Sequence, residues 1–280
     1  MSESVVIPTS DMFVRYLLGS KGHEELLCDF INAHLIDSGF EPVERVIIDN
    51  PFNLKEFDND KESILDVRAQ AKDQRIINVE IQTARQGVYV HRSLYYWARL
   101  YQGQLKNGEA YDILSPVICI NMFDFTIFDA IKEPHSCFLI AEKDHPEYVL
   151  TNDFQLHFYE MPKYQENAHS QNQLERWACF FQCEGKSQKG ETMEILLKND
   201  PILTRAHKEY VRFTEDKELR MAYEAREKYH RDQLFMLSSA KREGVKEGLS
   251  RAAAEMKRSG MDPERIRQFT GLSLEDIAKI

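Results

Sequence analysis

The chain has 280 residues, of which 42% are hydrophobic and 29% are charged, and its formal net charge is −10. This composition is typical of a globular protein with a substantial core, and no apolar run approaches the ~20 residues that a membrane-spanning helix needs. The negative charge argues against a protein that coats nucleic acid through bulk positive charge, but it leaves open a protein with a local basic surface.

The N-terminal part of the sequence predicts two helices followed by a strand. Thr9, Ser10 and Asp11 supply N-cap chemistry just before the apolar run MFVRYLLG, so we expect a first helix to begin there. Apolar residues then recur with helical period between Leu26 and Leu35, and Val43–Asp49 has the composition of a strand. As a cap, Asp11 would already have a sufficient structural role.

A β-hairpin is predicted in the stretch SILDVRAQAKDQRIINVEIQT. Two β-rich runs, Ile64–Ala71 and Ile76–Thr83, are separated by the polar residues 72–75. In both runs apolar and polar residues alternate, which gives a strand one apolar face and one polar face. The polar positions of the second run include Glu80 and Gln82.

Two acidic residues of this hairpin are expected to lie opposite each other. Asp66 and Glu80 are symmetric about Asp73, and cross-strand Cβ atoms on one face are roughly 4.5–5.5 Å apart. Two carboxylates that close repel each other unless a proton or a cation lies between them, and hard oxygen ligands suit Mg²⁺ or Mn²⁺. The pattern leaves two interpretations open, a metal site that includes Gln82 on the same face and a solvated strand face.

A helix with one apolar and one basic side is predicted at residues 86–106. The expected core side consists of Val90, Leu94, Trp97, Ala98, Tyr101 and Leu105. Basic residues recur every seven positions on the other side, namely Arg85, Arg92, Arg99 and Lys106. This basic side is either a solvated surface or a set of phosphate contacts, and the start of the helix soon after Gln82 favours DNA contacts by Arg85 and Arg92, with Arg99 further along.

Three further strands complete a mixed sheet of about six. The apolar run at Pro116–Phe123 is typical of a strand that is buried on both faces, and Ser136–Glu142 and Phe154–Met161 add two more. From about Gln171 the strand signals stop, and helices alone are expected to the end of the chain.

Residues that begin and end helices divide the C-terminal region. A charged helix is expected at Glu215–Lys241, and a helix that ends at Gly260 is followed by two short ones, which begin after Asp262 and Ser273. We therefore predict a core at residues 1–170, a helical extension at 171–249 and a helix-turn-helix-like tail at 250–280. Because the tail has few basic residues, protein contact or dimerisation and groove reading are both open.

Several motifs occur together in one order along the chain. LDVRAQ is followed by NVEIQ, DMFVRYLLG occupies Asp11–Gly19, a long match covers Tyr95–Met122, and TGLSLEDIAKI occupies Thr270–Ile280. In these motifs the chain resembles the recombination-promoting nuclease and transposase family of the PD-(D/E)XK nuclease superfamily. Gln82 stands where the wider superfamily has lysine, and Arg92 matches an arginine that recurs in the family before its tyrosines.

The resemblance implies a fold, an activity and a site. It implies an α/β, restriction-endonuclease-like core of αβββαβ order with a mixed sheet, and metal-dependent hydrolysis of DNA phosphodiester bonds. Asp66, Glu80 and the backbone carbonyl of Ile81 would bind Mg²⁺, or Mn²⁺ as a substitute, and Asp11 is a further candidate ligand. Gln82 would orient the attacking water.

Two other functions are compatible with the same sequence. One is a nucleic-acid-binding or toxin-neutralising module that keeps the fold without cleavage, and the other is an interaction protein whose helical C-terminal third matters most. Neither accounts for the expected gathering of Asp66, Glu80 and Gln82 on one face. The expected partners are DNA and a second copy of the chain in a homodimer, with no membrane. Because the N-terminus lacks a basic region followed by an apolar one, we expect a cytoplasmic protein.

Overall fold

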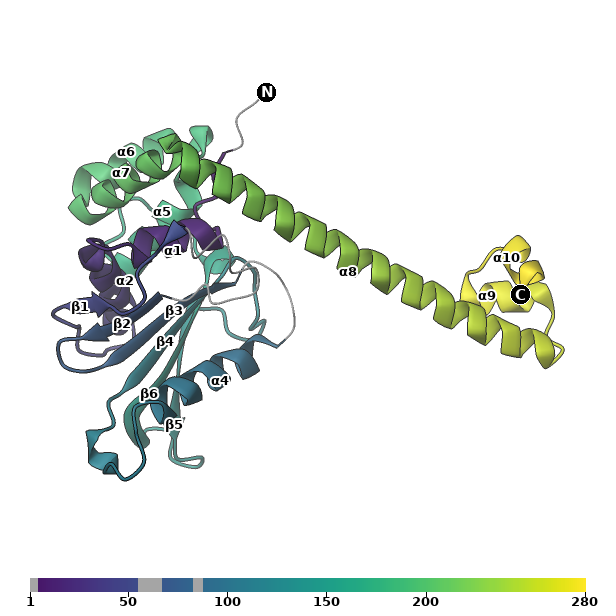
Figure 1. Ribbon diagram of the computed structural model, residues 1–280, viewed down its shortest axis with the longest axis horizontal. Coiled ribbons are helices and arrows are strands. Elements are labelled where there is room, and N and C mark those ends of the chain that lie inside the picture. Colours follow the sequence, from purple (N-terminus) through teal and green to yellow (C-terminus); the bar gives the residue numbers. More distant parts are fainter. Residues whose placement is uncertain (1–4, 55–66, 83–87) are drawn as a thin grey trace. The chain divides into compact units, whose positions relative to one another are not determined.

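The computed structural model describes residues 5–54, 67–82 and 88–280. The chain falls into two compact units, Met1–Tyr223 and Glu224–Ile280. The first unit is built on a six-stranded mixed sheet with helices on both faces (Figure 1). This architecture confirms the predicted α/β, restriction-endonuclease-like fold with a helical C-terminal region.

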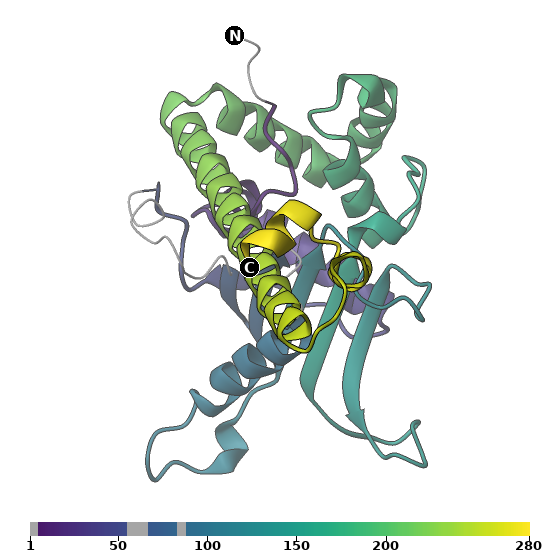
Figure 2. The same cartoon turned by 90° about the vertical axis from the view of Figure 1, so that its right-hand side faces the viewer.

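The sheet has the strand order β1-β2-β3-β4-β6-β5. Its strands are β1 (Val46–Ile48), β2 (Val67–Ala71), β3 (Ile76–Gln82), β4 (Val117–Phe123), β5 (His135–Ala141) and β6 (Val149–Glu160). The pairs β3–β4 and β4–β6 are parallel and the other pairs are antiparallel. Figure 2 shows the sheet turned by 90°, with the long β5–β6 hairpin in teal.

The β2–β3 hairpin has the register that the sequence predicts. Val67 pairs with Val79 and Gln70 pairs with Ile76, so the strands are symmetric about Asp73. The connection is a tight turn in which the Ala71 N–H donates to the Arg75 carbonyl at 2.8 Å. Gln74 adopts a φ of 73°, which is the left-handed position that such a turn needs.

One face of the sheet is covered by helices from both ends of the first unit. These are α1 (Asp11–Gly19), α2 (Glu24–Asp37) and α5 (Gln173–Cys183). The buried apolar residues of β3, Ile77, Val79 and Ile81, belong to the same core as residues of these helices. The alternation along β3 thus directs its apolar side chains to one core and leaves its polar side chains for the opposite face.

The opposite face is covered by α4 (Tyr89–Gln102). Trp97, Leu100 and Tyr101 of this helix pack against Phe154, Leu156 and other residues of a second core cluster. All residues of β4 are buried because helices cover both of its faces, which explains its continuous apolar sequence.

The orientation of α4 differs from the prediction. Val90 and Leu94, which we expected in the core, are each 42% exposed, whereas Tyr89 and Ser93 are buried. The reason is a polar contact, because the Ser93 hydroxyl donates to Asn121 Oδ1 on β4 at 2.7 Å. A count of apolar residues around a helix cannot detect such a contact.

The predicted cap of α1 also needs a correction. Ser10 is the N-cap, and its hydroxyl accepts from the Phe13 N–H. Asp11 is the first residue inside the helix and is only 3% exposed. A capping role therefore does not explain the buried carboxyl group of Asp11.

Further helices and short 3-10 turns accompany these elements in the described chain. The helices are α6 (Gly190–Asn199), α7 (Pro201–Glu215), α8 (Lys217–Arg258), α9 (Pro263–Thr270) and α10 (Leu274–Lys279), and the short 3-10 turns are η1 (Tyr111–Ile113), η2 (Met161–Lys163) and η3 (Ser187–Lys189). The helix that we predicted to end at Gly260 is the final part of the 42-residue α8 and not a separate helix. Among the described residues, no helix is both long and apolar enough to cross a membrane.

The second unit has a small core of its own. Ala253 from α8, Ile266 from α9, and Leu272 and Ile277 around α10 are buried together. Asp262 caps α9, Gly271 ends it with a φ of 69°, and Ser273 caps α10. The predicted start residues of the two short helices in this tail are therefore confirmed.

Candidate functional site

A row of buried and half-buried polar side chains lies on the face of the sheet that α4 covers. We call Asn78, Glu80, Gln82 and Asn121 the polar row. The first three alternate along β3 and so share one face, and Asn121 lies beside Glu80 in the parallel register of β3 and β4. Asn78 and Asn121 are each 2% exposed, and Glu80 is 5% exposed. A carboxyl group with so little exposure needs polar partners or a cation.

Glu80 lies between the amide side chains of its neighbours on the strand. Asn78 Nδ2 donates to Glu80 Oε1 at 3.5 Å, and Gln82 Nε2 donates to Glu80 Oε2 at 3.3 Å. Both hydrogen bonds are long, and together they orient the carboxylate between the two amides. The two neighbours thereby fix the direction in which the carboxylate faces.

The first turns of α4 supply a cation and a second anchor to the polar row. Arg92 Nε lies 4.0 Å from Glu80 Oε2, and the guanidinium carbon lies 5.4 Å from the centre of the Tyr96 ring. Arg92 Nε is buried, and within the described residues it has no hydrogen-bond partner. Ser93 anchors the next position of the helix to Asn121, whose Nδ2 donates to the His157 carbonyl at 3.1 Å.

A family model described as PD-(D/E)XK nuclease family transposase matches residues 8–240. The chain belongs to this family. The predicted resemblance is thereby confirmed, and membership supports a nuclease-like or transposase-like role with DNA as the implied substrate. No curated protein and no solved structure matches the chain.

The structure brings together some of the predicted site residues of this PD-(D/E)XK transposase family member. Glu80 and Gln82 are in contact, and Arg92 lies beside Glu80. Ile81, whose carbonyl is a predicted metal ligand, has its side chain in the core on the opposite face. Asp66 and Arg85 lie outside the described residues.

Two other predicted residues occupy different surroundings. Asp11 is buried at the start of α1, where its Oδ1 accepts from the Met12 N–H at 2.6 Å. Arg99 is exposed in the last turn of α4, and Lys106 follows the end of that helix. The predicted basic residues of α4 thus do not all lie on its outer side, because Arg92 Nε lies 4.0 Å from Glu80 Oε2 on the sheet.

Sequence reasoning missed three residues that contribute to the site. Asn78 continues the alternation of Glu80 and Gln82, which is a signal that the sequence contains. Asn121 interrupts an otherwise apolar strand, and a polar residue in a strand buried on both faces indicates a specific partner. Ser93 carries no comparable signal, because a serine in a helix is ordinarily exposed.

The described residues have the donor chemistry that suits a divalent cation, which PD-(D/E)XK nucleases generally use. Glu80 provides a carboxylate, and Asn78 Oδ1 is a buried oxygen that has no hydrogen-bond partner among the described residues. Oxygen donors of this kind fit Mg²⁺ or Mn²⁺. Within the described parts of the chain, no three His, Cys, Asp or Glu side chains gather as a metal site, so a complete site needs a further acid.

Proposed function

We propose that this protein is a metal-dependent endonuclease that hydrolyses DNA phosphodiester bonds, with a role in recombination or in mobile DNA. The observation that carries the proposal is the buried carboxylate of Glu80, held between Asn78 and Gln82 with Arg92 beside it, in a chain of a nuclease family. Burial of a carboxylate costs folding free energy, and such residues are concentrated at catalytic and binding sites.

The cation would be held by oxygen atoms from the β2–β3 hairpin. Asp66 is the further acid that we propose, because it directly precedes Val67, and the register partner of Val67 directly precedes Glu80. Glu80 and the carbonyl of Ile81 complete the proposed ligand set, with Asp11 as a further candidate. Mg²⁺ or Mn²⁺ bound there would supply Lewis-acid polarisation of the scissile phosphate and activation of water.

Gln82 and Arg92 have complementary roles in this proposal. The Gln82 amide is oriented by its contact with Glu80, so that its oxygen can accept a hydrogen bond from the attacking water. Arg92 presents a guanidinium whose Nε lies 4.0 Å from Glu80 Oε2 and has no hydrogen-bond partner among the described residues, and a phosphate oxygen would satisfy that donor. Arg85 and Arg99 would extend the phosphate contacts along the DNA.

Relaxation of a supercoiled plasmid by the purified protein tests the proposal. We expect nicked or linear plasmid with Mg²⁺ and with Mn²⁺, and intact plasmid with EDTA. A protein that binds DNA but leaves the plasmid intact with both metals would contradict the proposal and would favour a binding module on the same fold.

A further inference from the structure

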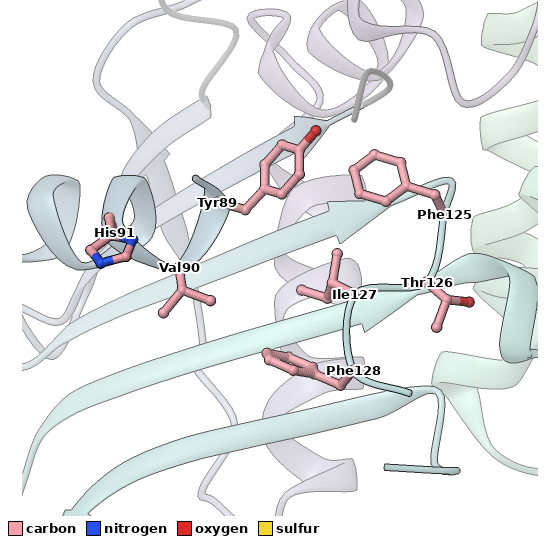
Figure 3. Close-up of a pocket in the computed structure, with 7 residues that line it drawn as sticks. All are labelled: Tyr89, Val90, His91, Phe125, Thr126, Ile127 and Phe128. Atoms are coloured by element: carbon pink, nitrogen blue, oxygen red, sulfur yellow. The ribbon is translucent and has the colours of Figure 1, made fainter. Parts of the chain in front are cut away.

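A pocket of about 340 Å³ opens next to the candidate site. Its lining comes from two segments, the start of α4 and residues 125–128 after β4, which contribute Tyr89, Val90, His91, Phe125, Thr126, Ile127 and Phe128. Figure 3 shows the Phe128 ring directed toward Val90, with Phe125 near Tyr89. The pocket is therefore lined mainly by aromatic and aliphatic side chains.

The wall formed by residues 125–128 is held in place from behind. The N–H groups of Ile127 and Phe128 donate to Glu160 Oε1 at 2.6 and 3.1 Å. Glu160 is fully buried and pairs with Lys163, which also donates to the Phe128 carbonyl at 2.9 Å. The Phe128 ring packs on Phe158 with their centres 5.2 Å apart. These contacts indicate a pocket that is formed before any ligand arrives.

The pocket and the polar row involve the same two parts of the fold, the β3–β4 region of the sheet and the start of α4. On the sheet, Gln82 pairs in register with Phe123, and the Tyr89 ring lies 5.4 Å from the Phe123 ring. On the helix, the pocket residue His91 directly precedes Arg92, which lies beside Glu80. A DNA strand whose phosphate contacts Arg92 would thus bring its adjoining nucleotide to the mouth of the pocket.

We propose that this pocket holds an unpaired nucleobase of the bound DNA, so that the protein prefers single-stranded or locally unpaired DNA at its site. The inference rests on the proposed function, because it takes DNA as the ligand of the polar row. A nucleobase has two flat apolar faces that suit aromatic and aliphatic walls, and stacking on such walls contributes about 1–3 kcal/mol per base. A base inside an intact duplex is stacked on its neighbours and cannot enter.

Binding measurements with Ca²⁺ and with EDTA in place of Mg²⁺ test this inference without measuring cleavage. The probes are a single-stranded oligonucleotide that carries 2-aminopurine and its fully paired duplex. We expect the wild type to bind the single strand about tenfold more tightly than the duplex, which corresponds to about 1.4 kcal/mol, and to quench the 2-aminopurine fluorescence. Equal affinity for the two probes, or fluorescence that binding does not change, would overturn the proposal.

A pair of variants on α4 separates the pocket from general charge effects. Val90 and Leu94 are both 42% exposed, but only Val90 lines the pocket. Val90→Glu places a charged group at the pocket and should remove most of the preference for the single strand. Leu94→Glu adds the same charge one turn further along the helix and should keep the preference. Equal preferences in the two variants would contradict a base-binding pocket.

The outcomes for the pocket and for the nuclease are distinguishable. If the wild type nicks plasmid with Mg²⁺ but binds both probes equally, the pocket proposal fails alone. If it discriminates between the probes and quenches the fluorescence but never nicks DNA, the nuclease proposal fails alone.

Discussion

Replacing Arg92 with Gln removes the one described cation that lies beside Glu80, and it keeps the helix propensity of α4 nearly unchanged. If Arg92 contacts a phosphate, the slope of log affinity against log salt concentration should become smaller by about 0.9. When the salt concentration rises from about 50 to about 200 mM, the fold-loss of affinity should then be about 3.5 times smaller in the variant than in the wild type.

The same substitution should have only a small effect on folding. A charge pair 4.0 Å apart attracts with a gross energy of about 4 kcal/mol in the environment of a protein surface. The Arg92 side chain is 35% exposed and makes no close hydrogen bond to Glu80, so the net contribution should not exceed about 1 kcal/mol. Urea denaturation measures this loss, which is too small to unfold the protein.

Fluorescence anisotropy of labelled duplex DNA at a series of salt concentrations gives the affinity and its salt slope. Arg99→Gln is the matched control, because it removes the same charge from the exposed last turn of the same helix. We expect a larger effect for Arg92→Gln than for Arg99→Gln. A salt slope and an affinity that stay at wild-type values in Arg92→Gln would refute a phosphate contact at this position.

Three further perturbations test the polar row and the buried histidines. Gln82→Ala should lose most of the cleavage rate with Mg²⁺ and Gln82→Lys should retain part of it, whereas full activity of the alanine variant would show that Gln82 only fills the strand face. Ser93→Ala leaves Asn121 Oδ1 without its donor and should lower the free energy of unfolding by about 1–3 kcal/mol in urea denaturation; an unchanged midpoint would contradict this. Burial lowers the pKa of His34 and of His157 well below 6.5. The unfolded chain therefore binds more protons than the folded protein below that pH, so the free energy of unfolding should fall as the pH drops from about 7.5 to about 5.5. The fall should be less steep in His34→Gln. A urea midpoint that rises as the pH drops would disprove this prediction.

The hairpin and the sheet could be predicted because their signals are local. The symmetric alternation about Asp73 sets the register of β2 and β3, since a slip by one residue would turn apolar side chains such as Val79 away from the core. The apolar run of β4 likewise predicts a strand covered on both faces. In these elements the chemistry of each residue agrees with its position in the fold.

The orientation of α4 could not be predicted in the same way. The apolar residues of the helix favour a face that includes Val90 and Leu94, but the helix packs through Tyr89 and Ser93. The choice depends on Asn121, which is distant in sequence and accepts directly from the Ser93 hydroxyl of the helix. Non-local hydrogen bonds of this kind are absent from any periodic pattern.

The candidate site was predictable in part for the same reason. Glu80 and Gln82 share a face because they are two residues apart on one strand, and their contact follows from that spacing. Asn121 and Ser93 belong to other elements, and the position of Arg92 depends on how α4 is turned. The pattern of β3 therefore predicts Glu80 and Gln82, whereas their partners from β4 and α4 depend on the tertiary fold.

Cleavage by two isosteric variants tests the central claim most directly. Glu80→Gln and Asp66→Asn keep the size of each side chain but remove the negative charge that a divalent cation needs. Glu147→Gln is the control, because Glu147 is a carboxylate whose side chain is 76% exposed. The account predicts that plasmid nicking with Mg²⁺ is lost in Glu80→Gln and in Asp66→Asn, and is retained in Glu147→Gln. Nicking at the wild-type rate by both Glu80→Gln and Asp66→Asn would contradict it.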